Sequence, residues 1–135
     1  MEENCMATKK ILVADDESHI LHVVSLKLRN AGFEVLTASD GQEAWELAQS
    51  ERPDLLITDY HMPQLSGLEL CHKLKHDPAT ARIPAIMLTA RGYELDPKDT
   101  ADSGILRTLS KPFSPRHLLT TVNEVLQEAA NEILT

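Results

Sequence analysis

Short apolar runs alternate along this chain with longer segments in which apolar residues recur every three or four positions. A continuous apolar run of about four to eight residues is typical of a buried strand, whereas the longer period is typical of a helix with one apolar face. The predicted strands are residues 9–15, 33–37, 55–59, 84–89 and 105–110. Because a helical pattern follows each strand, we expect an α/β fold with a parallel sheet and helices on both of its faces.

Most of the helical segments begin near a residue that can cap a helix. The predicted starts are Ser18, Asp40-Gly41, Ser66-Gly67, Glu94 and either Ser114 or Pro115. Gly32 is expected to end the first helix and Asp77-Pro78 the third. The fourth segment, residues 94–104, contains Pro97 and few apolar residues, so we expect a short, weakly anchored helix there.

Apolar positions on the third and last helices predict which of their faces cover the sheet. The inner face of the third helix is expected to contain Leu68, Cys71 and Leu74. The inner face of the last helix is expected to contain Leu118, Leu119, Val122, Leu126, Ala129 and Ile133. Cys71 is therefore predicted to be a free thiol that packs as a small hydrophobic side chain.

Length and composition indicate one folded domain. The 135 residues are 42% hydrophobic and 25% charged, as in ordinary globular proteins, and they suffice to bury a core. Residues 1–8 are polar and aperiodic and are predicted to be a flexible lead-in. The folded domain is expected over residues 9–130, and residues 131–135 are expected to complete the last helix.

The charge and the cysteines argue against several classes of function. A net charge of -8 disfavours binding of nucleic acid through this chain and docking on an anionic membrane. The sequence has no apolar run long enough to cross a bilayer, and residues 1–4 do not resemble a secretory signal. Cys5 and Cys71 form neither a disulfide framework nor a metal-binding spacing. We therefore expect a cytoplasmic protein.

Several predicted strands end on chemically matching groups. Asp15 ends the first strand and Asp16 follows it, Asp59 ends the third, Thr89 ends the fourth and Lys111 follows the fifth. In an open parallel sheet these strand ends meet at one edge, where ligands bind. Three crowded carboxylates need a compensating cation, and their hard oxygens suit Mg²⁺. With the Lys111 ammonium and the Thr89 hydroxyl nearby, such a site can neutralise a phosphoryl group in transfer to Asp59.

Each of these residues also has a purely structural explanation. Asp59 could cap the loop after its strand, Thr89 could cap a turn, and Lys111 could simply neutralise the acidic cluster. Their convergence at one edge of a parallel sheet is what favours a functional site.

The motifs resemble those of the receiver domains of bacterial two-component response regulators. The similarity rests on Asp15-Asp16, Asp59-x-x-Met62-Pro63-x-x-x-Gly67, Thr89-Ala90 and Lys111-Pro112-Phe113. It runs from about Lys9 to about Ala130, which is nearly the whole chain. The resemblance implies a flavodoxin-like, doubly wound sheet of five parallel strands in the order 2-1-3-4-5 with five helices. It also implies a single receiver, similar to the chemotaxis regulators, that is a regulatory phospho-acceptor rather than an enzyme.

By the same resemblance, Asp59 accepts a phosphoryl group from a histidine kinase or a histidine phosphotransfer protein. Asp16, Asp59 and the backbone carbonyl of His61 would bind Mg²⁺ (or Mn²⁺) directly, and Asp15 would act through water. Thr89 and Lys111 would hold the aspartyl phosphate. A cis Lys111–Pro112 peptide bond is expected, and the phosphorylated domain would act on a downstream protein that the sequence does not identify.

The chain departs from the family pattern on the surface that receivers use for output. Thr108 occupies the switch position, three residues before Lys111, where receivers usually carry Tyr or Phe. Residues 105–107 and the proline-bearing fourth helix lie on the same surface and also differ. His61 and Arg91 occupy the variable positions that flank the acceptor, and we hypothesise that they tune the lifetime of the aspartyl phosphate. Both could equally be solvated loop side chains.

Three other classes of protein share parts of this pattern. A haloacid-dehalogenase-like phosphatase also uses an Asp nucleophile and Mg²⁺, but its second Asp would stand where this chain has His61. A flavodoxin-like flavin carrier needs a phosphate-binding loop after the first strand, where residues 15–17 are acidic instead. A docking module with a vestigial site stays open because of Thr108.

Overall fold

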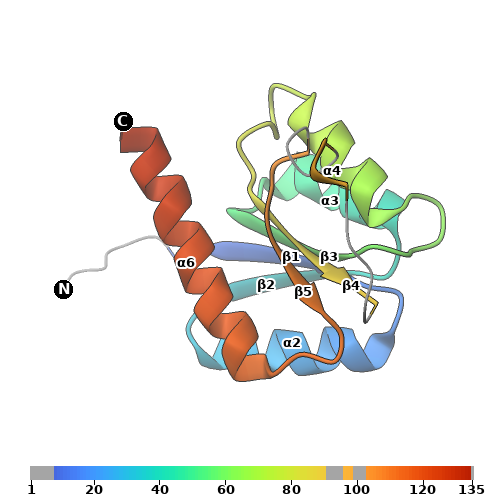
Figure 1. Cartoon of the computed structure of the whole chain (residues 1–135), viewed down its shortest axis with the longest axis vertical. Coiled ribbons are helices and arrows are strands. Elements are labelled where there is room, and N and C mark those ends of the chain that lie inside the picture. The colour runs from blue at the N-terminus through green and yellow to red at the C-terminus, as the bar shows by residue number, and fades with distance from the viewer. Residues whose placement is uncertain (1–7, 91–95, 99–102, 135) are drawn as a thin grey trace.

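A five-stranded parallel sheet forms the centre of the computed structural model, which describes residues 8–90, 96–98 and 103–134, the last four without their side chains. The strands are β1 (Lys10–Ala14), β2 (Glu34–Ala38), β3 (Leu55–Asp59), β4 (Ala85–Thr89) and β5 (Ile105–Ser110). Their order is β2-β1-β3-β4-β5 and every neighbouring pair is parallel. The predicted flavodoxin-like order is therefore confirmed (Figure 1).

Helices cover both faces of the sheet. They are α2 (Ser18–Asn30), α3 (Gly41–Glu51), α4 (Gly67–Lys75) and α6 (Pro115–Leu134). Figure 1 shows α2 below the strands and α3 and α4 above them, and α6 contributes to the same apolar cluster as α2. No helix in the described ranges is long and apolar enough to span a membrane.

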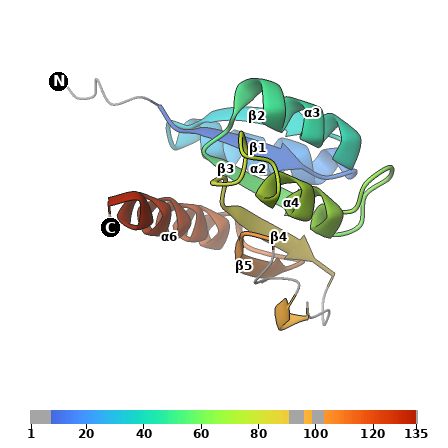
Figure 2. The ribbon, with the colours of Figure 1, turned by 90° about the horizontal axis from the view of Figure 1, so that it is seen from above.

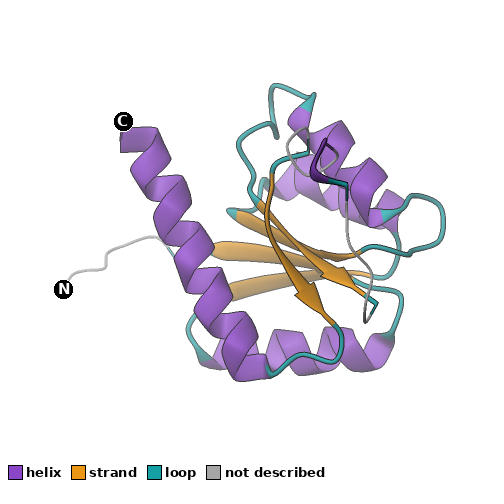
Figure 3. Cartoon of the chain, viewed as in Figure 1, coloured by secondary structure: helices purple, strands orange, loops and turns teal. Residues whose placement is uncertain are grey.

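The expected fourth helix falls largely outside the described residues (Figure 3). Of residues 94–104, only 96–98, 103 and 104 are described, and helical backbone is present at Pro97 and Lys98. The described parts therefore contain four long helices where five were expected. The expected lead-in also lies outside them, apart from Thr8, as do Cys5 and Arg91.

Two apolar clusters, one on each face of the sheet, form the core. All residues of β3 and β4 are buried, as expected for central strands covered on both faces. The last helix buries Leu118, Val122 and Val125 against the sheet, and α4 buries Leu70, Cys71 and Leu74. Val125 and Leu70 were absent from the predicted faces, whereas Leu68 and Leu119 are only partly buried.

Cys71 is a free cysteine within the core, as predicted. Its side chain is 1% exposed, and burial raises the pKa of the thiol to about 12. The thiol therefore stays protonated at neutral pH and packs as a small apolar group.

The helix ends follow the predicted capping residues with one exception. Asp40 and Ser66 accept the backbone N–H of Glu43 and Glu69, and Ser114 Oγ accepts those of Arg116 and His117. Gly32 has a left-handed φ of +99° directly after the last turn of α2. The prediction for Ser18 was wrong: Glu17 occupies the N-cap position and gives no side-chain cap. The Glu17 side chain instead contacts Lys111.

Candidate functional site

The parallel strands place the predicted residues at one edge of the sheet. Asp15 follows β1, Asp59 and Thr89 end β3 and β4, and Lys111 follows β5. The backbone N–H of Lys111 donates to the carbonyl of Thr89 at 2.8 Å, which fixes the end of β5 against that of β4. The Lys111–Pro112 peptide bond is cis, as expected. The convergence deduced from the strand ends is therefore present in the fold.

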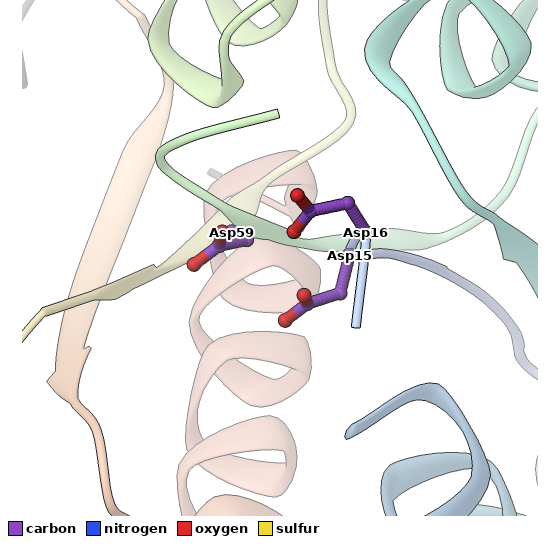
Figure 4. A group of neighbouring side chains, drawn as sticks. All are labelled: Asp15, Asp16 and Asp59. Carbon is purple, nitrogen blue, oxygen red and sulfur yellow. The ribbon is translucent and has the colours of Figure 1, made fainter. Parts of the chain in front are cut away.

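Three carboxylates form a cluster at this edge. One oxygen from each of Asp15, Asp16 and Asp59 lies within 4.8 Å of the others. Figure 4 shows the three side chains extending from neighbouring strand ends toward the same side. Asp15 and Asp59 are buried whereas Asp16 is exposed, so a bound ion would meet protein oxygens on one side and solvent on the other. This oxygen-only set fits Mg²⁺, which commonly combines one or two carboxylates with several waters.

The Lys111 ammonium compensates the acidic cluster. Its Nζ lies 3.0 Å from Asp15 Oδ2, 3.1 Å from Asp59 Oδ1 and 2.8 Å from Glu17 Oε1. The Lys111 side chain is only 18% exposed. The sequence predicted that Lys111 lies beside the aspartates, but the contact between Lys111 and Glu17 was not predicted. The available signal was the position of Glu17, directly after the acidic pair and directly before α2.

The acid–base balance of the site follows from burial and these ion pairs. Burial raises the pKa of Asp15, although the Glu17 N–H and Lys111 both favour its charged form. Burial opposes the charge on Lys111, but hydrogen bonds to Glu17, Asp15 and Asp59 outweigh it and raise the lysine pKa. The hydrogen bond from Lys111 also lowers the pKa of Glu17. Lys111 is therefore a permanent cation at neutral pH.

The Thr89 hydroxyl is buried beside β5 and makes one long contact. Its Oγ1 donates to the carbonyl of Leu109 at 3.5 Å, the outer limit for a hydrogen bond. Ala90, the next residue, is exposed and its small side chain leaves space at this edge. The hydroxyl can therefore change partner at little cost.

The flanking residue His61 and the switch residue Thr108 lie at the surface. His61 is exposed in the loop after β3, with its ring edge-on to Tyr60 at a centroid distance of 4.7 Å. Thr108 is exposed on β5, opposite Met87 in the register. Its short side chain leaves this position without the aromatic ring that the family pattern provides.

A close backbone contact holds the loop between β3 and α4, which carries His61. The N–H of Gly67 donates to the carbonyl of Tyr60 at 2.8 Å. A Cβ at Gly67 would lie 2.1 Å from the carbonyl oxygen of Asp59, far inside contact distance. Only glycine therefore lets the start of α4 pack against the end of β3, which explains its place in the Asp59–Gly67 motif.

Comparison with known proteins agrees with this geometry. The model of the family described as "Response regulator receiver domain" matches residues 11–123. The chain is 39% identical over 121 residues to the alkaline phosphatase synthesis transcriptional regulatory protein PhoP of Bacillus subtilis, covering 90% of this chain and 50% of that protein. It is 39% identical over 122 residues to the phosphate regulon transcriptional regulatory protein PhoB of Pseudomonas aeruginosa, covering 90% and 53%. The chain thus spans about half the length of these curated relatives.

Solved structures show the same fold over nearly their whole length. The chemotaxis response regulator CheY4 of Vibrio cholerae superposes with a TM-score of 0.81 at 35% identity, over 88% of this chain and 99% of that one. A CheY-like receiver domain protein from Methanospirillum hungatei superposes with a TM-score of 0.83 at 29% identity, over 93% and 99%. The strand order and the acidic edge therefore occur in a fold that receiver domains share.

Proposed function

The chain belongs to the family of response regulator receiver domains of two-component systems, and we propose that Asp59 is its phospho-acceptor. The observation that carries the proposal is the placement of Asp59 at the end of a central strand, with its Oδ1 3.1 Å from the Lys111 ammonium. Asp15 and Asp16 complete the cluster on the other side. A phosphoryl group on Asp59 would lie between a fixed cation and a carboxylate pair able to hold a metal.

The proposed donor is a phosphohistidine of a kinase or of a phosphotransfer protein. A carboxylate oxygen of Asp59 attacks the phosphorus, and the new O–P bond forms as the P–N bond breaks. The electron pair of that bond stays on the histidine nitrogen. With acetyl phosphate as donor, acetate leaves instead. The chain is then a regulatory acceptor of the phosphoryl group rather than an enzyme that turns over a separate substrate.

The proposed metal ligands are Asp16, Asp59 and the backbone carbonyl of His61, with Asp15 acting through water. Mg²⁺ or Mn²⁺, when bound, would neutralise charge on the phosphoryl oxygens. The chain contributes carboxylates that the strand ends already hold close together. Little reorganisation is then needed when the metal and the donor arrive.

Lys111 and Thr89 are proposed to hold the phosphoryl group after transfer. Lys111 can give up its contact with Asp59 for a phosphoryl oxygen while it keeps Asp15 and Glu17. The Thr89 hydroxyl can leave its long contact with Leu109 at small cost, because a 3.5 Å hydrogen bond is weak. When both groups change partner in this way, the structural effect of phosphorylation would reach the ends of β4 and β5.

We further propose that phosphorylation changes the surface formed by β5 and α6, which the downstream partner would recognise. Thr108 has no ring to move, so this surface must respond through other contacts. The ion pair between Arg107 and Glu128 joins β5 to α6 on this surface and is one such contact. A docking module that ignores phosphorylation is the competing function, favoured only by the exposed Thr108.

Incubation with Mg²⁺ and acetyl phosphate, followed by intact-mass measurement, tests the proposal. We expect the protein to gain one phosphoryl group, and EDTA or the Asp59→Asn variant to prevent the gain. Asp96→Asn, which changes an exposed carboxylate outside the cluster, is the matched control and should be labelled normally. Labelling that persists in Asp59→Asn would refute the acceptor assignment. If acetyl phosphate does not label the folded protein and beryllofluoride does not bind to it, a docking module that ignores phosphorylation becomes the better explanation.

A further inference from the structure

A groove lies at the edge of the sheet opposite Asp59. It consists of two adjoining hollows of about 350 and 490 Å³, which share the lining residues Arg82, Ile83, Pro84 and Ala129. Pro84 directly precedes β4, so the groove lies where the strands begin. Figures 1 and 2 show the C-terminal half of α6 continuing past the sheet on this side. The groove runs between that half of the helix and the loop from α4 to β4.

Cationic side chains are spread along the walls of the groove. They are Lys75 in one hollow, Lys9 and Arg52 in the other, and Arg82 in both. None of the four has an ion-pair partner within the described part of the chain. Asp54 is the one carboxylate among the described wall residues, and it accepts the backbone N–H of Lys10 at 2.8 Å. The groove is thus locally cationic in a chain with a net charge of -8.

The floor of the groove is apolar. It is formed by Ile83, Pro84, Leu106, Leu126 and Ala129. Leu106 is the extra residue of a bulge in β5, because Ile105 and Arg107 pair with the adjacent residues Ala85 and Ile86. Leu106 and Leu126 are only partly buried. An apolar floor between unpaired cations suits a ligand that carries both apolar and acidic groups.

We propose that this groove binds an extended acidic segment of a partner protein, with an apolar side chain on the floor and acidic residues on either side. The cations are distributed over both hollows rather than gathered at one point, which favours several separate carboxylates over a single phosphate. The net charge of -8 opposes a nucleic acid, whose many phosphates would meet acidic surface beyond the groove. The acidic segment is therefore the occupant whose charge and shape match the groove.

The groove and the phospho-acceptor can be occupied at the same time. Each strand has five or six residues, so the two edges lie on the order of 17 Å apart, at about 3.3 Å per residue. A kinase at Asp59 would therefore not displace a segment bound beside Arg82. The groove would add a second partner to the receiver without using the residues around Asp59.

Nuclear magnetic resonance on the isotope-labelled full chain can test this proposal. The probe is a short synthetic peptide in which glutamates flank two leucines, and its control has glutamine at every glutamate. We expect the acidic peptide to shift the amide signals of Ile83, Gly104 and Ala129 but not that of Asp59. Added salt should weaken the binding, because exposed charges are screened. Equal binding of the glutamine peptide, or shifts confined to the acidic edge, would overturn the proposal.

Charge reversal at Arg82 provides the matched comparison. Arg82→Glu should lower the affinity for the acidic peptide by about tenfold, because it replaces an attractive charge in the groove with a repulsive one. Arg116→Glu makes the same change in net charge at an exposed position at the start of α6, and should leave the affinity unchanged. Equal loss in both variants would show only a long-range charge effect and would contradict a specific groove. Shifts of the groove signals that follow protein concentration without peptide would instead assign the groove to a second copy of the chain.

Discussion

The two edges of the sheet carry opposite charges, and the fold holds these charges in different ways. At the carboxyl ends of the strands, Asp15 is fully buried and shares the Lys111 ammonium with Asp59. At the amino ends, Arg82 and Lys75 are exposed and have no ion-pair partner in the described part of the chain. Buried and paired charges are pre-oriented for one small group, whereas exposed and unpaired charges suit a flexible partner that brings its own counter-charges.

Among variants that test the difference between the two edges, Lys111→Met is expected to change stability the most. Removing the ammonium leaves two buried carboxylates without their cation, which should lower the free energy of unfolding by about 3 kcal/mol in metal-free buffer. Urea denaturation with EDTA measures this loss, and added Mg²⁺ should recover part of it. Lys10→Met is the control, because its ion pair with Glu51 is exposed and should contribute about 0–1 kcal/mol. Similar losses in both variants would mean that the acidic edge is not held together by its lysine.

Gly67→Ala should have the next largest effect, because it disturbs the acceptor loop without changing any charge. The new Cβ would clash with the Asp59 carbonyl, and relief of such overpacking typically costs about 1–3 kcal/mol. Movement of the end of β3 should also slow labelling by acetyl phosphate. Gly32→Ala is strained by its φ of +99° but meets no atom within 4 Å, so it should lower stability without slowing labelling. Equal labelling rates in the two variants would contradict the prediction, because they would show that packing at Gly67 does not position Asp59 for phosphorylation.

A smaller effect, of opposite sign, is expected from Asp15→Asn. Burial raises the folded-state pKa of Asp15, so the charged carboxylate destabilises the metal-free fold at neutral pH. The neutral amide should therefore raise the midpoint of thermal unfolding in EDTA. This gain should shrink as the pH falls through the raised pKa toward 3.8, the ordinary pKa of an aspartate side chain, because the wild-type carboxyl then becomes neutral too. A variant less stable than the wild type at pH 7 would show that the Lys111 contact outweighs burial.

The smallest effect concerns coupling between the two edges. Leu106, Leu126 and Ala129 of the groove belong to β5 and α6 but lie at the strand ends opposite Asp59. Beryllofluoride with Mg²⁺ should therefore change the affinity of the acidic peptide by less than about twofold. Titration of the peptide with and without beryllofluoride measures the coupling. A much larger change would mean that the strands transmit the state of Asp59 to the groove, so that the edges act as one unit.

The sequence sufficed for the fold and for most of the acidic edge because both depend on local patterns. Apolar runs mark the strands, and parallel strands must deliver Asp59, Thr89 and Lys111 to a common edge. The contact between Glu17 and Lys111 joins residues 94 positions apart, and it depends on the rotation of α2 relative to β5. Local pattern carries no such information, so Glu17 was assigned no role and Ser18 was given a cap that it does not form.

The groove could not be predicted for the same reason. Its walls come from separate segments near Lys9, Arg52, Lys75, Arg82 and Ala129, none of which forms a motif. The bulge at Leu106 likewise depends on the pairing of β5 with β4. Buried Val125 and Leu70 were missed because the face that a helix buries against a sheet is wider than the few apolar positions assigned to it.

The central claim is that Asp59 carries an acyl phosphate, and mapping the phosphorylated residue tests it most directly. Protein labelled with acetyl phosphate and Mg²⁺ is reduced with borohydride, which converts an aspartyl phosphate to homoserine, and its peptides are sequenced by mass spectrometry. The account predicts homoserine at position 59 and unmodified Asp15 and Asp16. Homoserine at either of those two positions, or phosphate retained on a hydroxyl or a histidine, would contradict it.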